Sequence, residues 1–514
     1  MSQPNIVVIC SDQHHPLVTG YRGHTFVQTP HLDQLAADGA YFSRAYSNCP
    51  VCTPSRMSFI TGKYPHQIDS WFLGCPLDRK EMTWSRKLHE AGIPSTMFGK
   101  MDFCGDYQDG GFTDYKIIKK RAAFNPYPRT TPLPSRLEGS LRTQKRILIE
   151  KAGYRDETVS FEPRKDGGEG YNLAVGFYDH DKQVTDWAIE FVKQKGQEST
   201  KKPWAMYMGF MFPHWPFMVP KKYFDLYYPD RVAIPHDAHF PNENLHPQVR
   251  NMQRALDLGS LSEPMLRKVI SAYYGMITAL DENIGRLVAE LKAQNLYDDT
   301  YIVYMSDHGE NLGEHGLFYK QCSYEGSVGV PLVLKGPGVP AGQRIDHPVT
   351  LVDLYPTIME IMNLDTESDR PGQSWLSLLK NNNKERKDYA FSEYHGNFFK
   401  QDWYMLVRGD YKYTYYVNDR PSLFNVKEDP QELHDLANDE RYVSVLKDFE
   451  SKLREVVDPE KVSLRAKKDL GLIGKEGEDY TLTLSEPQLK ELIKQGVFQH
   501  EPEFPSWPES NVNP

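Results

Sequence analysis

Residues 52–63 read Cys-Thr-Pro-Ser-Arg-Met-Ser-Phe-Ile-Thr-Gly-Lys. Pro54 suits the first turn of a helix, where its missing N–H costs no hydrogen bond, and Gly62 suits the position just past the end. The stretch therefore predicts a helix that begins at Cys52 and ends before Gly62. The free N–H groups and the positive end of the dipole at such an N-terminus favour an anion. Arg56, one turn further on, could hold an oxyanion there through two parallel hydrogen bonds.

Two other interpretations of Cys52 stay open. A cysteine near the start of a helix is often only a small, partly buried residue. Cys49-Pro-Val-Cys52 has the CxxC spacing of a redox pair, but a redox role does not account for Pro54 and Arg56. Six cysteines in 514 residues are too few for a disulfide scaffold, and their spacing gives no zinc pattern.

Length and charge limit the kind of protein. A chain of 514 residues predicts one large domain and one smaller one. The net charge of −10 argues against nucleic acid as a partner. No stretch approaches the ~20 apolar residues of a membrane helix, so no membrane partner is expected. The N-terminus shows no signal peptide, which predicts a cytoplasmic protein as written, or a periplasmic or secreted one if the N-terminus was trimmed.

Short apolar runs alternate with helical patterns through the first two-thirds of the chain, which is typical of an α/β fold with a mainly parallel central sheet sandwiched by helices. The predicted strands of this part are Asn5–Cys10, Ile93–Phe98, Trp204–Met211, Tyr301–Met305 and Val330–Leu334, and its clearest further helices are Thr29–Gly39 and Pro264–Asn295.

The character of the sequence changes after about residue 372. Aromatic, alternating stretches predict an antiparallel sheet in a smaller C-terminal domain, covered by a helix at about 442–456. Its predicted strands are Tyr389–Ser392, Trp403–Arg408, Tyr411–Tyr416 and Ser422–Asn425. The predicted domains are a catalytic part at 1–375 with a variable insertion at 105–175, an antiparallel-sheet subdomain at 376–457, and a C-terminal extension at 458–514 that could mediate a homo-oligomer.

Polar residues follow four of the predicted strands. They are Asp12 and Gln13, Lys100, His214, and Asp307 with His308. In open α/β sheets, ligands bind beyond the carboxyl ends of the strands. The sequence therefore predicts that these clusters share one site with Cys52.

Three motifs resemble those of one family. Cys-x-Pro-x-Arg followed by Thr-Gly-Lys is similar to the signature of the type I sulfatases, in which Arg more often stands at Lys63. Residues 306–324, SDHGENLGEHGLFYKQCSY, resemble the second motif of that family, and residues 423–436 resemble its closing motif. The resemblance covers most of the chain and implies an alkaline-phosphatase-like fold.

The resemblance also implies a mechanism. A formylglycine-generating maturation enzyme would convert Cys52 to formylglycine, whose hydrated aldehyde attacks sulfur. Lys100 and Lys320 match lysines that bind the sulfate with Arg56, and His214 matches the histidine that protonates the leaving alcohol. The implied metal ligands, which suit Ca²⁺ with Mn²⁺ or Mg²⁺ as alternatives, are Asp12, Gln13, Cys52, Asp307 and His308.

Several positions depart from the usual family pattern. Asp-Gln at 12–13 and Asp-His at 307–308 are similar to the branch of choline sulfatases and phosphonate monoester hydrolases, alongside the glycan sulfatases, and in that branch the metal can be Mn²⁺. Asp102 stands where the family more often has His, so it should either turn away from a sulfate or bind a cationic or hydroxyl group. Gly329 stands where Arg often precedes a strand.

The substrate class is predicted less directly. Aromatic residues next to the candidate site and a basic run between 116 and 165 favour a sulfated saccharide. The aromatic residues are Trp71, Phe72, Trp215 and Phe217. Three alternatives stay open: a phosphonate or phosphate ester hydrolase on the same scaffold, a choline-sulfatase-like enzyme for a small alcohol, and a non-catalytic binder of sulfated ligands.

Overall fold

The computed structural model describes residues 3–117, 152–155, 173–199, 202–238, 245–256, 261–380, 386–396 and 401–470. Most of the basic run predicted to meet an anionic substrate lies outside these ranges, as does most of the extension predicted to mediate a homo-oligomer.

The central sheet has eight strands in the order β11-β2-β10-β9-β1-β7-β4-β5. Every described strand of this sheet runs parallel to β1 except β10, which pairs antiparallel with β9 and β2. The strands are β1 Asn5–Ser11, β2 Ala40–Phe42, β4 Ser95–Gly99, β5 Asp114–Lys116, β7 Ala205–Gly209, β9 Thr300–Ser306, β10 Leu332–Lys335 and β11 Gln343–Ile345. The predicted mainly parallel α/β fold is confirmed.

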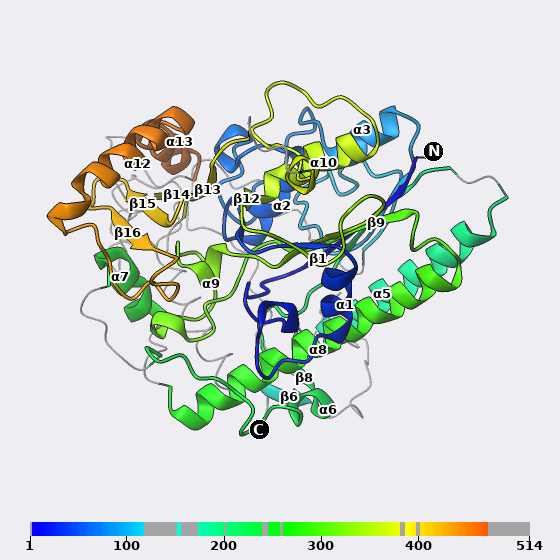
Figure 1. The fold of residues 1–514 in the computed structure, drawn as a ribbon, viewed down its shortest axis with the longest axis horizontal. Helices are drawn as coiled ribbons and strands as arrows, with labels where there is room; N and C mark the ends of the chain where they lie inside the picture. The colour runs from blue at the N-terminus through cyan, green and yellow to red at the C-terminus, as the bar shows by residue number, and fades with distance from the viewer. Residues whose placement is uncertain are drawn as a thin grey trace, which may run out of the picture.

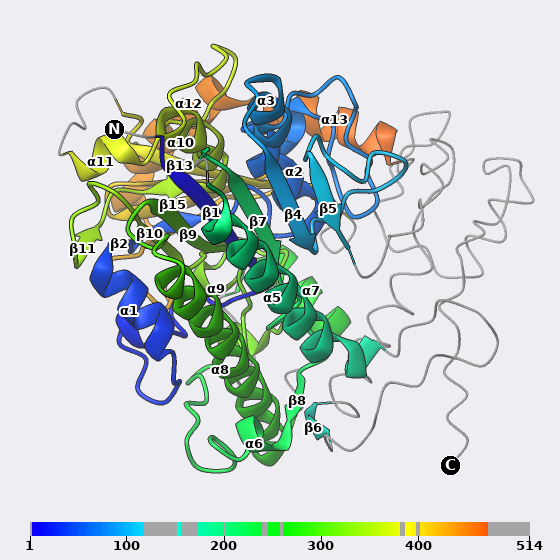
Figure 2. The same cartoon turned by 90° about the vertical axis from the view of Figure 1, so that its right-hand side faces the viewer.

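Both faces of the sheet are covered by helices, as Figures 1 and 2 show. Successive residues of β1 belong to two cores: Val7 and Ile9 pack on the side of α1, α5 and α8, whereas Ile6 and Val8 pack on the side of α2, α3 and α10. A strand buried on both faces favours apolar residues at successive positions, which explains the unbroken apolar run from Ile6 to Cys10. The helices are α1 Pro30–Asp38, α2 Cys52–Thr61, α3 Trp84–Glu90, α5 Leu173–Gln197, α8 Glu263–Ala293 and α10 Leu354–Ile361.

The helix predicted from Cys52 has the expected ends. It runs over Cys52–Thr61, all ten of its residues are buried, and Gly62 follows in the left-handed conformation with φ 67°. The N–H of Gly62 donates to the carbonyl of Ser58. A Cβ at Gly62 would also lie 2.7 Å from that of Tyr355, so glycine is required by both backbone and space.

The C-terminal sheet is the predicted antiparallel meander. Its strands are β13 Tyr389–Tyr394, β14 Trp403–Arg408, β15 Tyr411–Tyr416 and β16 Ser422–Asn425. The predicted helix is α12 Val443–Val456, whose Phe449 ring lies 5.7 Å from that of Tyr413 on β15. Figure 1 places this sheet and α12 to one side of the central sheet.

Several elements were not predicted. The longest is α5, and α13 Pro459–Asp469 occupies the start of the predicted extension. The other unpredicted elements include β2, β5, β11, α3 and α10, whose bounds are given above. The rest are β3 Ala45–Tyr46, β6 Gly153–Arg155, β8 Met218–Pro220, β12 Val349–Thr350, α6 Lys221–Phe224, α7 Pro247–Leu256, α9 Glu325–Val328 and α11 Leu376–Leu379, with short 3₁₀ helices between them. Of the helices in the described ranges, none is long and apolar enough to cross a membrane.

Candidate active site

The candidate site lies where four neighbouring parallel strands end. In the order β9-β1-β7-β4, their carboxyl ends meet at one edge of the sheet, and the polar clusters predicted from the sequence follow directly. The N-terminus of α2 brings Cys52 and Arg56 to the same place, and Lys320 arrives on the loop after the 3₁₀ helix Glu314–Gly316. All the predicted site residues are therefore brought together.

Four of the predicted metal ligands form one buried cluster. Asp12, Cys52, Asp307 and His308 each offer a ligand atom, and these atoms all lie within 4.8 Å of one another. Both carboxylates are completely buried, and Nε2 of His308 lies 3.3 Å from Sγ of Cys52. Two buried carboxylates and an imidazole within this distance of one another suit a divalent cation, so this donor set fits the implied metal.

The fifth predicted ligand, Gln13, is held in a defined orientation. Its backbone has φ 68°, an uncommon conformation for a residue other than glycine. Its Nε2 contacts the carboxylate of Glu310, and its Oε1 accepts a hydrogen bond from Nζ of Lys320 at 2.6 Å. Because Glu310 takes the amide nitrogen, the amide oxygen faces Lys320, whose ammonium also lies 3.5 Å from Sγ of Cys52.

Arg56 has a different contact pattern from the one predicted. Its Nε donates to Asp307 at 2.8 Å, and one terminal nitrogen donates to Asp12 at 3.1 Å. The other terminal nitrogen donates to the carbonyl of Lys100 and to the hydroxyl of Tyr207. Four of the five guanidinium N–H groups are thus engaged. The expectation of two parallel bonds to an oxyanion is wrong here, because Arg56 instead clamps the two carboxylates.

Lys100 lies between two carboxylates. Its Nζ contacts Oδ2 of Asp12 and lies 3.4 Å from Oδ2 of Asp102. Although burial lowers the pKa of Lys100, Asp102 and Asp12 outweigh it and raise the pKa above the ordinary value. The structure shows neither of the two arrangements predicted for Asp102, because its carboxylate faces the ammonium of Lys100.

His214 presents Nε2 to the site. Its Nδ1 lies 2.5 Å from the carbonyl oxygen of Trp215, so Nδ1 carries a proton and donates it. Nε2 lies 3.9 Å from Oδ1 of Asp12. Burial and the positive charge of Lys320 lower the pKa of His214 well below the usual value. With Nδ1 fixed, Nε2 is the atom that can exchange a proton with a bound molecule.

The thiol of Cys52 is not activated in this setting. Burial, followed by the negative charge of Asp12, raises the pKa of Cys52 to about 11, although Lys100 and Lys320 act in the opposite sense. Burial also raises the pKa of Cys49 well above its ordinary value. Since the thiolate is the reactive form, these surroundings disfavour both a thiolate nucleophile and the redox-pair interpretation.

Only part of the predicted aromatic surface exists. Trp71 and Phe217 are core residues: Trp71 packs on His395 and donates to Asp469 of α13, and Phe217 packs on Tyr273. Phe72 is buried as well, with 8% of its surface exposed. Trp215 is only partly buried and stacks on His214 with ring centres 5.5 Å apart.

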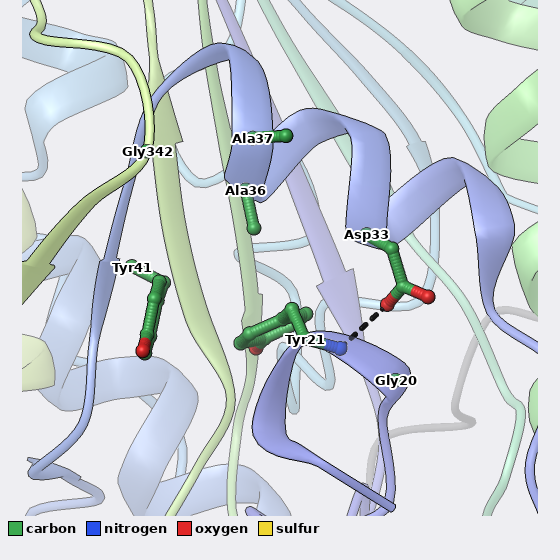
Figure 3. A pocket seen from close by; sticks show the side chains of 7 residues that line it. All are labelled: Gly20, Tyr21, Asp33, Ala36, Ala37, Tyr41 and Gly342. Atoms are coloured by element: carbon green, nitrogen blue, oxygen red, sulfur yellow. Dashed lines mark hydrogen bonds between the residues drawn. The ribbon is translucent and has the colours of Figure 1, made fainter.

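A separate shallow pocket opens beside α1 and the 3₁₀ helix Gly20–Arg22, and Figure 3 shows it. The rings of Tyr21 and Tyr41 form its walls, and the carboxylate of Asp33 accepts a hydrogen bond from the N–H of Tyr21 at 2.7 Å. None of the predicted site residues lines it. It is therefore a different feature from the strand-end site.

Sequence reasoning missed three residues that support the site. Glu310 orients Gln13, Tyr207 accepts from Arg56, and Asp181 of α5 holds the turn before His214. Glu310 lies inside the 306–324 motif, shortly after the predicted ligands Asp307 and His308. A carboxylate so close to two predicted ligands was a signal that the sequence offered. The sequence offered no such signal for Tyr207 and Asp181, because the residues that they contact are distant in the sequence.

Comparisons with known proteins show the family to which the chain belongs. The sulfatase family profile matches residues 4–364, and a profile described as N-sulphoglucosamine sulphohydrolase, C-terminal, matches residues 313–458. Arylsulfatase K of Mus musculus is 29% identical over 490 residues, which cover 90% of this chain and 80% of that protein. The choline-sulfatase of Rhizobium meliloti (strain 1021) is 28% identical over 448 residues, covering 85% and 83%.

Solved structures share the fold. A protein solved in complex with its substrate D-glucosamine-2-N,6-O-disulfate superposes with a TM-score of 0.72 at 21% identity, covering 91% of this chain and 99% of its own. The phosphonate monoester hydrolase of Agrobacterium radiobacter gives 0.67 at 23% identity, covering 94% and 99%. The family profile spans well over half of the chain and extends past Asp307 and His308, the last predicted ligands in the sequence. The predicted resemblance is therefore confirmed: the protein belongs to the sulfatase family and is a sulfuric ester hydrolase.

Proposed function

We propose that the chain hydrolyses a sulfate ester of a saccharide, with Cys52 converted to formylglycine by a maturation enzyme and an oxidant. One observation carries the proposal: the side chain of Cys52 lies at the N-terminus of α2, within a few ångströms of two carboxylates, an imidazole and Lys320. Once formed, the hydrated aldehyde supplies a hydroxyl group for attack on sulfur.

The buried carboxylates hold the metal in this proposal. Asp12, Asp307, His308 and the Oε1 of Gln13 bind a divalent cation, for which we favour Ca²⁺. When bound, that cation supplies positive charge that acidifies a hydroxyl group beside it. Arg56 favours the ionised forms of Asp12 and Asp307 and holds both carboxylates in place through its bonds to them, although burial raises the pKa of Asp307.

The lysines and the histidine act on the ester. The ammonium groups of Lys100 and Lys320 bind the sulfate oxygens and neutralise the charge that develops on them. The bound sulfate offsets the charges of Lys320 and Lys100, which add to the effect of burial in lowering the pKa of His214, and so favours a proton on Nε2. As the ester S–O bond breaks, that proton passes to the leaving oxygen. Overall, one water is consumed, and sulfate, the alcohol and a proton are released.

A saccharide is the favoured substrate class for two reasons. The partly exposed ring of Trp215 stacks on His214, on the side where the alcohol leaves, and such a ring suits the face of a sugar. The second profile match and one fold relative are described with sulfated glucosamine, which supports the same class for this chain.

The test is the mass of the tryptic peptide Ala45–Arg56 from protein co-expressed with a formylglycine-generating enzyme. The expected peptide carries an aldehyde at position 52, and the same preparation should release sulfate from sulfated oligosaccharides. An unmodified thiol in folded protein would contradict the mechanism. Faster turnover of choline sulfate or a phosphonate monoester than of any sulfated saccharide would contradict the substrate class.

A further inference from the structure

One buried carboxylate on α5 holds the backbone that leads to His214. Asp181 is completely buried, and its two oxygens accept hydrogen bonds from the N–H groups of Met211 and Phe212 at 2.7 and 2.9 Å. The N–H of His214 donates in turn to the carbonyl of Met211 at 2.9 Å. The turn from residue 211 to 214 is therefore fixed at both ends, with Asp181 as its outer support.

The same turn is tied to the metal side of the site. The carbonyl of Phe212 accepts a hydrogen bond from the N–H of Asp12 at 3.2 Å. Helix α5 adds ring contacts, since Phe177 lies 6.1 Å from the ring of His214 and Tyr178 lies 6.3 Å from that of Phe212. The spacing between His214 and Asp12 thus depends on where α5 holds the turn.

A buried carboxylate is costly unless it is fully hydrogen-bonded. Asp181 has those bonds, because His180 contacts Oδ1 at 2.8 Å in addition to the two N–H groups. A purely structural role is the simpler explanation: Asp181 would be present only because it accepts hydrogen bonds from two buried backbone N–H groups. What distinguishes Asp181 is the place of those groups, two and three residues before the side chain that faces the leaving oxygen.

We propose that Asp181 is a positioning residue, which holds Nε2 of His214 at the leaving oxygen of the sulfate ester. The inference rests on the role proposed above for His214. A small displacement of a proton donor weakens proton transfer far more than it weakens substrate binding. Loss of Asp181 should therefore act on kcat, and most strongly where the departing alcohol needs a proton.

The experiment compares Asp181→Asn and His214→Gln with the unchanged enzyme, all carrying formylglycine and metal. Turnover is measured on a series of aryl sulfates from para-nitrophenyl to phenyl sulfate. In Asp181→Asn, kcat on phenyl sulfate should fall roughly 10²-fold. It should fall much less on para-nitrophenyl sulfate, whose phenolate leaves without a proton, and KM should change little on both.

Asp281→Asn is the matched control. Asp281 of α8 is also buried and also accepts from two backbone N–H groups, those of His31 and Leu32 at 3.1 and 2.8 Å. It touches no part of the turn before His214 in the described contacts. Its variant should lose stability but keep the leaving-group dependence of the unchanged enzyme.

The outcomes separate the two ideas. In one outcome, kcat of His214→Gln falls steeply from para-nitrophenyl to phenyl sulfate, whereas kcat of Asp181→Asn varies along the series as in the unchanged enzyme. That result overturns the role of Asp181 alone. If kcat of His214→Gln does not fall more steeply along the series than that of the unchanged enzyme, the proposed role of His214 is overturned, and this inference with it. If Asp181→Asn does not fold, His180→Ala replaces it, since that change removes a side-chain partner but keeps the carboxylate. His180→Ala should also make kcat fall more steeply from para-nitrophenyl to phenyl sulfate, but by a smaller factor than Asp181→Asn. If His180→Ala leaves the variation of kcat unchanged, the inference is overturned.

Discussion

The buried arginine of the site acts on the two carboxylates rather than on the substrate. Arg56, Asp12 and Asp307 are all completely buried, and the guanidinium bonds to both acids. Burial of three charges costs free energy, and such a set persists only when every charge has partners. Here the arginine favours the ionised form of both acids and holds them a few ångströms apart, which is the state that a divalent cation requires.

Replacement of Arg56 by an uncharged residue should therefore destabilise the folded protein. Arg56→Met leaves Asp307 buried without its arginine partner and Asp12 with Lys100 as the cation in contact with it, and should lower the free energy of unfolding by about 3–5 kcal/mol. The measurement is urea unfolding in the presence of a chelator, so that no metal compensates for the lost charge.

Arg267→Met is the control, because Arg267 pairs with Glu263 one turn away on the exposed surface of α8. That change should alter the unfolding free energy by less than about 1 kcal/mol. Equal effects of the two substitutions would contradict the clamp role of Arg56.

At the scale of helices and strands, the sequence predicted the elements whose ends are set locally. Helix α2 begins and ends where its proline and glycine placed it, and β14, β15 and β16 have the predicted bounds. Helix α5 was missed because charged residues interrupt its apolar stripe, so its burial depends on contacts with α8 and β4. Helix α13 was missed for a similar reason, since its buried residues include Ser463 and Lys467 and form no continuous apolar stripe.

The docking of α13 can be tested on the helix itself. Arg465 lies 5.0 Å above the ring of Trp71 and contacts the carbonyl of His66, while Asp469 accepts from the Trp71 indole. Ala466 is completely buried, so Ala466→Glu should expel α13 and lower the unfolding free energy by about 2–4 kcal/mol. Tryptophan fluorescence should shift towards that of an exposed indole.

Leu464→Glu is the matched substitution on the opposite side of α13, where 47% of the residue is exposed. It should leave both the stability and the fluorescence close to those of the unchanged protein. If Ala466→Glu behaves in the same way, α13 does not dock on the body in solution.

At the scale of the molecule, the site combines segments that are hundreds of residues apart. The sequence predicted which side chains meet, because strand ends of a parallel sheet share one edge and the motifs are specific. It did not predict their pairing. Whether Arg56 contacts an anion or two acids, and whether Asp102 faces Lys100, depends on side-chain orientation that no local pattern encodes.

A cluster of ionisable residues joins the C-terminal sheet to the 3₁₀ helix Pro65–Gln67, which follows α2. Glu393 of β13 contacts Nδ1 of His66 at 2.9 Å and Nε2 of His395 at 3.0 Å, and Nδ1 of His395 lies 3.2 Å from Asp402. Burial opposes charge on both groups, yet the nearby acids raise the pKa of His395 to about 9, and the histidines lower the pKa of Glu393 to about 2. The packing of the C-terminal sheet therefore depends on pH.

The direction of that dependence follows from the two shifts. His395 contributes stability fully below its ordinary pKa of 6.5, and this contribution is lost as the pH rises through about 9. Glu393 contributes fully above its ordinary 4.5, and its contribution is lost as the pH falls towards about 2. The network thus stabilises the protein most between the two ordinary values. The alkaline loss should be on the order of 3 kcal/mol, as expected for a shift of this size.

His395→Gln isolates the alkaline side of this dependence. Glutamine keeps a hydrogen-bonding side chain but cannot carry the proton, so the fall in unfolding free energy between pH 6.5 and 9 should flatten, and stability near pH 6 should drop. The measurement is urea unfolding at a series of pH values, with His434→Gln as control because its side chain is 78% exposed. The control should retain the slope of the unchanged protein. If His395→Gln retains it too, His395 stays neutral in the folded protein, and hydrogen bonds rather than charge hold the C-terminal sheet to the 3₁₀ helix Pro65–Gln67.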